Sequence, residues 1–108
     1  GEIYLLTSSP RELSLAKLGK IGIDANLFSR KFYSDIPGIG SKLEGEAFDY
    51  VLKKSIYKAP QHFSVGDRVN SDIIPVKKRG MKSILVHGIS EEADFCISEI
   101  NELEGLLL

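Results

Sequence analysis

The sequence predicts an α/β fold built around a parallel sheet, and two observations support this prediction. Short, continuous apolar runs alternate along the chain with longer segments in which apolar residues have helical spacing. Continuous apolar runs are typical of strands that are buried on both faces, as in a parallel sheet. Their alternation with helices is typical of βαβ units, in which a helix connects two parallel strands.

The first unit begins with the apolar run of residues 3–6, which we expect to form a strand. Ser9 can cap the following helix, and Pro10 suits its first turn. This helix should end near Gly19 or Gly22, because glycine readily adopts the left-handed conformation that closes helices. Its inner face is marked by Leu13, Ala16, Lys17 and Ile21 and widened by Leu15 and Leu18.

The second unit combines a short strand over residues 31–34 with a loop over residues 35–41 that is rich in turn-forming residues. A helix over residues 44–54 should follow, because apolar residues recur there at helical spacing. Its expected inner face consists of Ala47, Phe48, Val51 and Leu52.

The remaining elements continue the same alternation. We expect strands over residues 63–65, 83–86 and 94–97, and a helix over residues 71–79 that closes at Gly80. A final helical stripe consists of Ile100, Leu103, Leu106 and Leu107. No repeat, low-complexity tract or linker interrupts the pattern, so we expect residues 1–108 to form a single domain.

Composition places the chain among ordinary globular domains. The 108 residues are 43% hydrophobic and 27% charged, with a formal net charge of −1. We expect no nucleic-acid partner from this charge, and no membrane partner, because no apolar run approaches the roughly 20 residues that cross a bilayer. The single cysteine, Cys96, excludes an intramolecular disulfide and favours a reducing compartment. A cytoplasmic location is therefore expected.

The beginning of the sequence is unusual. Residue 1 is glycine, the only methionine is Met81, and the first apolar run already starts at Ile3. Removal of the initiator methionine would give such a start, and so would a break inside a longer chain. We expect a fragment.

The stretch of residues 63–72 carries the strongest functional signal. Its apolar run ends at Gly66 and Asp67, and a second aspartate follows at position 72. A strand that stops there delivers Asp67 to the carboxyl edge of the sheet, where α/β proteins bind ligands. Asp67 and Asp72 together suit Mg²⁺, which takes oxygen ligands and keeps several waters. A turn residue and a helix N-cap would explain the same two aspartates without a metal.

Thr7 also follows a buried-type run, so it should stand at the same sheet edge as Asp67. Its hydroxyl and the amide of Ser8 can donate hydrogen bonds to phosphate oxygens. Lys42, which precedes the second helix, can offset the charge of a phosphoryl group and of a neighbouring carboxylate. Taken singly, Thr7 is equally explained as a loop residue and Lys42 as a surface lysine. Their order along the chain before Asp67 is what joins them into a candidate phosphate site.

Other polar residues are expected to be structural. His62 and His87 have no second ligand at metal-binding spacing, and Cys96 lies inside an apolar strand where packing is the simplest role. Arg68 and Asn70 lie between the two aspartates, in a position to line a pocket. A short basic cluster, expected to be a solvated helix end, consists of Lys77, Lys78, Arg79 and Lys82.

In this order the pieces resemble the later part of the haloacid-dehalogenase-like (HAD) superfamily, a group of Mg²⁺-dependent phosphohydrolases with an aspartate nucleophile. Residues 3–8 are similar to its second motif, a strand that ends in Thr or Ser. Residues 42–52 resemble the third motif, although Leu43 stands where many relatives have proline. Residues 63–86 closely match the fourth motif and its following strand, and the ending resembles the closing strand and helix.

The resemblance implies a Rossmann-like, three-layer core with a parallel sheet and a role for each candidate residue. Thr7 and Ser8 would bind the phosphoryl group of a small phosphorylated substrate, and Lys42 would act as the catalytic lysine that steadies this group and the nucleophile. Asp67 would bind Mg²⁺, and Asp72 would do so directly or through water.

The family's first motif, Asp-x-Asp-x-Thr or Asp-x-Asp-x-Ser, has no counterpart in the sequence. In the family this motif ends the opening strand, which is central in the sheet, and supplies the nucleophile. The resemblance therefore implies an incomplete core that lacks this strand and a cap. We expect the chain alone to be inactive and to require an upstream segment or a second chain.

Three functions are compatible with this pattern. The first is part of a Mg²⁺-dependent phosphatase-type hydrolase that acts on a phosphomonoester. The second is a catalytically silent binding or interaction module, in which Asp67 and Asp72 are caps or a weak cation site. A receiver-like doubly wound domain is the third, and it is less favoured because such domains gather their acidic residues near the start.

Overall fold

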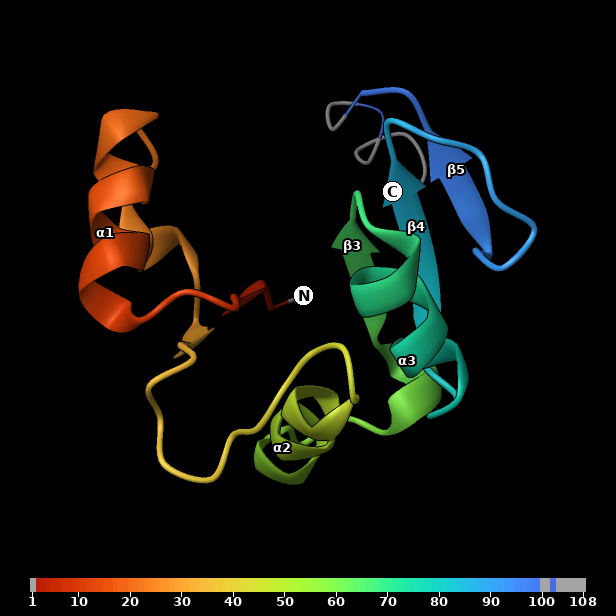
Figure 1. The fold of residues 1–108 in the computed structure, drawn as a ribbon, viewed down its shortest axis with the longest axis horizontal. Helices are drawn as coiled ribbons and strands as arrows, with labels where there is room; N and C mark the ends of the chain where they lie inside the picture. The colour runs from red at the N-terminus through yellow and green to blue at the C-terminus, as the bar shows by residue number, and fades with distance from the viewer. Residues whose placement is uncertain (1, 100–101, 103–108) are drawn as a thin grey trace.

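The computed structural model in Figure 1 describes residues 2–99 and 102, and these residues form a mixed α/β fold, as predicted. Helical elements alternate with strands along the chain. The elements are β1 (Tyr4–Leu6), α1 (Arg11–Lys20), η1 (Ala25–Leu27), β2 (Arg30–Phe32), α2 (Glu46–Lys54), η2 (Ala59–Gln61), β3 (Phe63–Gly66), η3 (Val69–Ile73), α3 (Ile74–Lys77), β4 (Lys82–Val86) and β5 (Phe95–Ile97).

The strands form two separate sheets in which every neighbouring pair is parallel. β1 pairs with β2, so that Leu5 lies opposite Lys31. β3, β4 and β5 form the second sheet in this spatial order, with Ile84 opposite both Val65 and Phe95. β1 and β3 share no hydrogen-bond ladder, as expected for a core without the strand between them.

β4 is the central strand of the second sheet, and its sequence explains this position. Its last four residues, Ser83, Ile84, Leu85 and Val86, are all buried. A strand that is covered on both faces cannot alternate polar and apolar side chains, so it appears as one continuous apolar run. Ser83 is tolerated because its hydroxyl donates a hydrogen bond to Asp94 Oδ2, at 3.3 Å.

Helix α2 packs against both halves of the chain, and Figure 1 shows it at the bottom of the view, below the two sheets. Ala47 and Val51 pack with Phe32 and Ile39 beside the first sheet. Phe48, on another side of the helix, packs with residues of the second half of the chain, Val76 and Met81. Ala47, Phe48 and Val51 form the buried face that helical spacing predicted, and Leu52 is half-buried. The helix begins at Glu46, two residues later than predicted, because Gly45 has a left-handed φ of 88°.

Helix α1 differs from the prediction in its start and in its buried face. Pro10 is the N-cap residue, and the Ser9 hydroxyl instead accepts a hydrogen bond from Lys17 Nζ, at 3.2 Å. Ser14 is its one buried residue, whereas Leu13 is 48% exposed. Figure 1 shows α1 at the outer side of the first sheet, away from β3–β5. The predicted end is confirmed, since Gly22 closes the helix with a φ of 78°.

The predicted helix over residues 71–79 is replaced by two shorter pieces. A single π-helical turn, η3, leads into the short helix α3, and Gly80 closes the segment with a φ of 76°. Asp72 lies within the π turn, so it is not the helix N-cap. A π turn adds one residue to a helical turn, and such turns frequently occur at functional sites.

The edge strand β5 corrects the expectation for Cys96, which is exposed rather than buried. Side chains alternate along a strand, so Cys96 lies on the face of β5 opposite to that of Phe95 and Ile97, and of these three only Ile97 is buried. The stripe of Ile100, Leu103, Leu106 and Leu107 lies outside the described residues. Among the helices of the described part, none is both long and apolar enough to cross a membrane.

Candidate phosphate and metal site

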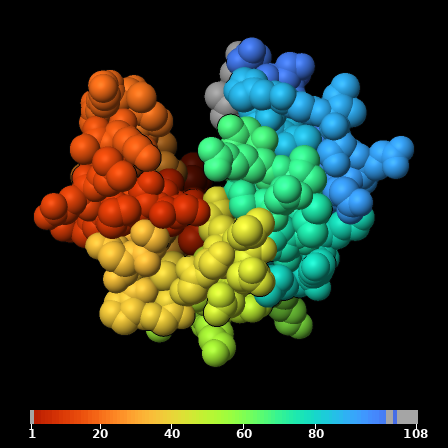
Figure 2. Space-filling view, in the orientation of Figure 1, coloured from red at the N-terminus to blue at the C-terminus, as the bar shows by residue number. Residues whose placement is uncertain are grey.

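A cavity of about 780 Å³ lies at the carboxyl ends of β1 and β3. Figure 2 shows the notch between the N-terminal part of the chain, in red and orange, and the green segment that follows β3. Residues from both parts, and from the yellow segment that runs from β2 into α2, form the wall of the cavity. These are Thr7, Ser8, Ser34, Ile39, Gly40, Ser41, Lys42, Leu43, Ala47, Arg68, Val69, Asn70 and Ser71.

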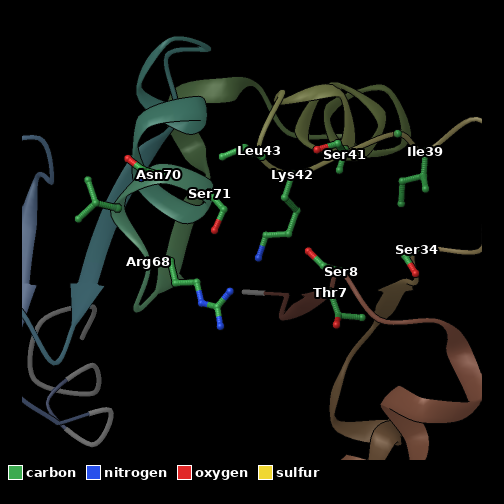
Figure 3. A pocket seen from close by; sticks show the side chains of 13 residues that line it. Thr7, Ser8, Ser34, Ile39, Ser41, Lys42, Leu43, Arg68, Asn70 and Ser71 are labelled. Atoms are coloured by element: carbon green, nitrogen blue, oxygen red, sulfur yellow. The ribbon is translucent and has the colours of Figure 1, made fainter.

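Thr7 and Ser8 lie on the side of the cavity that β1 forms, as predicted (Figure 3). The amide of Thr7 donates to the carbonyl of Phe32, at 3.1 Å, which continues the ladder between β1 and β2. The Thr7 hydroxyl oxygen accepts a hydrogen bond from the amide of Ser9, at 3.1 Å. Because a threonine hydroxyl has one hydrogen and two lone pairs, its hydrogen is left to donate to a ligand.

Lys42 reaches the same cavity from the turn before α2 and forms an ion pair with Asp72. Lys42 Nζ lies 2.5 Å from Asp72 Oδ1, and the two side chains are only 18% and 9% exposed. The sequence placed both residues in the site and predicted that Lys42 offsets the charge of a neighbouring carboxylate, without identifying that carboxylate as Asp72. Because both charges are largely removed from water, each requires the other.

The fold holds Asp72 in place through several contacts. Its second carboxylate oxygen, Oδ2, accepts a hydrogen bond from the amide of Arg68, at 3.1 Å. Its carbonyl accepts a hydrogen bond from the hydroxyl of Ser64 in β3, at 3.0 Å. Gly66 lies against the carboxylate so closely that a Cβ at position 66 would clash with it. Gly66 is therefore required for room rather than for a left-handed turn.

Asp67 and Asp72 occupy different environments, although both were predicted to bind Mg²⁺. Both carboxylate oxygens of Asp72 have protein partners. Asp67 directly follows β3 and is exposed, and its carboxylate has no hydrogen-bond partner among residues 2–99 and 102. It is not among the residues that line the cavity, whereas its neighbour Arg68 is.

The donor chemistry of this site fits Mg²⁺, but the described residues do not form a complete metal cage. Carboxylate oxygens are hard ligands, and Mg²⁺ is usually held by one or two carboxylates, substrate phosphates and water. No group of three or more His, Cys, Asp or Glu side chains comes together as a metal site in the described part of the chain. Further ligands would have to come from substrate, water or another segment.

Sequence reasoning placed Arg68 and Asn70 near a pocket, and the structure shows both in the cavity wall. It missed Ser34 and Ser41, which lie in the loop between β2 and α2 and also line the cavity. A loop rich in serine and glycine was the available signal, because such loops bring hydroxyls and backbone groups close to ligands.

A second, smaller cavity of about 120 Å³ lies directly between the two sheets. Tyr4 and Leu6 of β1 line one side, and Phe63 and Val65 of β3 line the other. Lys42 and Asp72 border it as well, so it lies beside the larger cavity. The edges of β1 and β3 that face this space pair with no strand of the described residues.

Neither histidine lines the larger cavity, although His62 borders the smaller one. His62 Nδ1 is 2.8 Å from the carbonyl of Lys58, and its Nε2 is 2.8 Å from the hydroxyl of Ser55. Both ring nitrogens are therefore used to fix the connection between α2 and β3. His87 is exposed at the end of β4, with a left-handed φ of 64°.

No protein-family model matches this sequence, and no curated protein is significantly similar to it. Solved structures are similar in fold. YfnB from Bacillus subtilis, which is assigned to the HAD hydrolases and was crystallised with bound magnesium, superposes with a TM-score of 0.84 at 20% identity. A HAD phosphatase from Thermococcus onnurineus superposes with a TM-score of 0.82 at 24% identity. In both cases the likeness covers 98% of this chain.

The chain spans only 49% of the YfnB structure and 50% of the Thermococcus structure, about half of each. It spans 73% of the core domain of a protein from Streptococcus pneumoniae that is assigned as a phosphoglycolate phosphatase, with a TM-score of 0.72 at 20% identity. The likeness thus extends to a structure that consists of the core domain alone. The resemblance seen in the sequence is confirmed at the level of fold: this chain has the α/β fold of the HAD hydrolase core.

Proposed function

We propose that this chain is part of a Mg²⁺-dependent phosphatase-type hydrolase, which acts on a small phosphomonoester through an aspartate nucleophile supplied by an upstream segment. One observation carries the proposal. The adjacent residues Thr7 and Ser8 line one cavity with Lys42, which lies more than 30 residues further along the chain, and Asp72 pairs with Lys42 at its side. Structural neighbours described as phosphatases, and the magnesium bound to YfnB, support it.

In this proposal the phosphoryl group is held from two sides. The Thr7 hydroxyl, whose oxygen already accepts from Ser9, donates its hydrogen to one phosphoryl oxygen. The amide of Ser8 donates to another oxygen. The Lys42 ammonium offsets the phosphoryl charge, and its ion pair with Asp72 fixes its position before the substrate arrives.

The metal would be held by the exposed carboxylate of Asp67, together with water and substrate oxygens. Asp72, whose oxygens already have partners, would reach the ion through one of its waters. When bound, Mg²⁺ offsets negative charge that develops during phosphoryl transfer.

The nucleophile would arrive on a strand inserted between β1 and β3. A carboxylate oxygen of this segment attacks phosphorus, the ester P–O bond breaks, and the departing alcohol oxygen takes a proton from a second carboxyl group of the same segment, which regains it from water in the next step. Water then hydrolyses the acyl phosphate, which releases inorganic phosphate and restores the carboxylate. The unpaired edges of β1 and β3 and the small cavity between them support this placement.

The test compares this chain with a longer one that includes the residues encoded upstream of Gly1. The longer protein should release phosphate from p-nitrophenyl phosphate only when Mg²⁺ is present, and Asp67→Ala should abolish the release. Unchanged activity in Asp67→Ala would remove Asp67 from the mechanism. An upstream segment with no carboxylate would contradict the proposed nucleophile.

Amide hydrogen exchange tests the missing strand separately from catalysis. In the isolated chain, the amides of β1 and β3 that face the small cavity should exchange quickly, and the upstream segment should protect them. Cooperative unfolding of the isolated chain as a monomer, with near-complete protection of both strands, would show that no further strand is needed.

A catalytically silent module remains the second candidate, and one observation favours it. Both oxygens of Asp72 serve the fold, which is what a purely structural aspartate would show. Titration of the longer protein with Mg²⁺ separates the two candidates. A silent module would show neither heat of binding nor a rise in melting temperature, whereas the hydrolase should show both.

A further inference from the structure

We infer that Arg68 recognises a second negatively charged group on the substrate, separate from the phosphoryl group that reacts. This inference rests on the proposed function, because it names the class of phosphomonoester that the same cavity would accept. The substrate would be a small molecule with a phosphate at one end and a carboxylate or second phosphate at the other.

The backbone of Arg68 is fixed while its side chain is left available. Its amide donates to Asp72 Oδ2, at 3.1 Å, and its carbonyl accepts from the amide of Asp72, at 2.8 Å. The guanidinium forms no hydrogen bond or ion pair with any residue in the ranges 2–99 and 102. Figure 3 shows it directed toward the side of the cavity where Lys42 and Thr7 lie.

The charges around the cavity are unbalanced. Among the described residues, Lys42 and Arg68 are the cationic ones that line it, and no aspartate or glutamate of this part of the chain does so. Asp72 balances Lys42 from behind, across the ion pair. The charge of Arg68 therefore has no counterpart in the wall, and an anionic ligand would supply it.

Arg79, which follows α3, shows how a guanidinium in this protein binds an anion. Arg79 holds the carboxylate of Asp49 with two hydrogen bonds, of 2.7 and 3.0 Å. The planar guanidinium fork matches a carboxylate or phosphate in this two-point manner. Arg68 has the same fork, directed at the cavity instead of at an acidic side chain.

The positions of the two cations argue for two anionic groups rather than one. Thr7, Ser8 and Lys42 surround the reacting phosphoryl group in the proposal, whereas Arg68 extends from the opposite wall, which follows β3 (Figure 3). The cavity of about 780 Å³ has room for a small organic ligand and not only for one phosphate. Asn70 and Ser71, next to Arg68 in the wall, add hydrogen-bond donors on that side.

The test uses the protein with its upstream segment and three substrates of equal chain length: an unbranched alkyl phosphate, the same chain with a terminal carboxylate, and the same chain with a second terminal phosphate. Arg68→Gln should lower kcat/KM for the two doubly anionic substrates by about 10- to 100-fold, the range expected for a charged hydrogen bond. The plain alkyl phosphate should change by less than about 3-fold. The doubly anionic substrate that loses more identifies the preferred second group.

Arg30→Gln is the matched control, because Arg30 is exposed on β2 and does not line the cavity. It should leave all three values unchanged. Equal losses of kcat/KM for all three substrates in Arg68→Gln would place Arg68 at the reacting phosphoryl group and overturn the inference. An unchanged kcat/KM for all three substrates would overturn it as well. Melting temperatures of both variants separate these outcomes from unfolding.

A second readout distinguishes failure of this inference from failure of the proposed function. If the protein hydrolyses none of the substrates, the proposed function is wrong. Calorimetric titration with the alkyl phosphonate analogues still tests Arg68. Arg68→Gln should weaken binding of the phosphonate that has a second anionic group and should not change binding of the plain alkyl phosphonate. Equal affinity of wild type and Arg68→Gln for the doubly anionic phosphonate would contradict the inference.

Discussion

Arg79 and Asp49 are 30 residues apart in the sequence and are joined by two hydrogen bonds. Nε of Arg79 lies 2.7 Å from Oδ1 of Asp49, and Nη2 lies 3.0 Å from Oδ2. A third hydrogen bond, of 2.9 Å, runs from Nη1 to the carbonyl of Pro75 in α3. The guanidinium thus links α2 to the segment that contains Asp72. The basic cluster that contains Arg79 was expected to be a solvated helix end, but Arg79 instead binds two other parts of the chain.

The Arg79–Asp49 pair makes stability depend on pH. Its hydrogen bonds lower the pKa of Asp49 from its ordinary value of 3.8. Because the folded-state pKa is depressed, the pair stabilises the fold above the unfolded pKa, and this contribution disappears as the pH falls through the folded-state value. The Asp49 side chain is 55% exposed, so the contribution should be on the order of 0.5 kcal/mol. Urea unfolding of wild type and Asp49→Asn should differ near neutral pH and converge in acid; a constant difference would contradict this assignment.

Gly66 should tolerate no side chain. Gly66→Ala places a methyl group against the Asp72 carboxylate, and the strain should lower the free energy of unfolding by about 1–3 kcal/mol. It should also disturb Lys42, because Asp72 would have to move. Gly19→Ala is the matched control, since Gly19 lies in α1 with open space around the position of a Cβ. That change should stabilise by about 0.5–1 kcal/mol. Similar effects of the two substitutions in urea unfolding would show that Gly66 has room.

The Lys42–Asp72 pair should be coupled in stability. Asp72→Asn leaves Lys42 with no full counter-charge in a largely buried position, so we expect a loss of about 2–3 kcal/mol in the free energy of unfolding. Lys42→Met together with Asp72→Asn should lose less than the sum of the two single changes. A double-mutant cycle should give a coupling energy of about 1–2 kcal/mol. If the two single losses in free energy of unfolding add up to the loss in the double variant, the interaction between Lys42 and Asp72 contributes nothing to stability.

Thr7 should act through its hydroxyl alone. Thr7→Val keeps the shape of the side chain but removes the hydrogen that would be donated to the phosphoryl group, so kcat/KM should fall by about 10- to 100-fold. Thr7→Ser retains the hydroxyl and should stay within about 5-fold of wild type. The measurement is phosphate release by the protein with its upstream segment. Equal losses in both variants would indicate that the methyl group matters and the hydroxyl does not.

Magnesium affinity should depend on the carboxylate of Asp67. Asp67 has a free, exposed carboxylate in the described part of the chain, so Asp67→Asn should weaken Mg²⁺ binding by at least about 10-fold. Glu44→Gln, an exposed acidic residue near Lys42, is the control and should change little. Calorimetric titration with MgCl₂ measures both. A larger loss of Mg²⁺ affinity in Glu44→Gln than in Asp67→Asn would show that Asp67 is not the main metal ligand.

The strands and the position of the site could be predicted because they depend on simple patterns. The buried run that becomes β4 is continuous. Thr7 and Asp67 each directly follow a strand, and the cavity lies at the carboxyl ends of these two strands, although only Thr7 lines it. Lys42 could be placed by its order in the chain. These inferences need only periodicity and strand direction.

Other features depend on contacts that a single sequence does not reveal. The π turn at Val69–Ile73 has no periodic signature, so Asp72 was placed at a helix start, where it would have been a cap. The exposure of Cys96 depends on which face of the edge strand β5 is covered. For the same reason Leu13 and Ile21, at helical spacing, are exposed in and just after α1. Helical spacing identifies a face but does not tell whether another element covers it.

The open edges of β1 and β3 also determine how the isolated chain should behave at high concentration. β1 has the sequence Tyr-Leu-Leu and β3 the sequence Phe-Ser-Val-Gly. Neither strand contains a lysine, glutamate or proline that would disfavour pairing with a strand of another molecule. Proteins normally protect exposed strand edges with such gatekeeper residues, because an unprotected edge recruits strands from other copies. The upstream segment proposed above would therefore also suppress aggregation, and expression of this chain without it should favour aggregates over monomers.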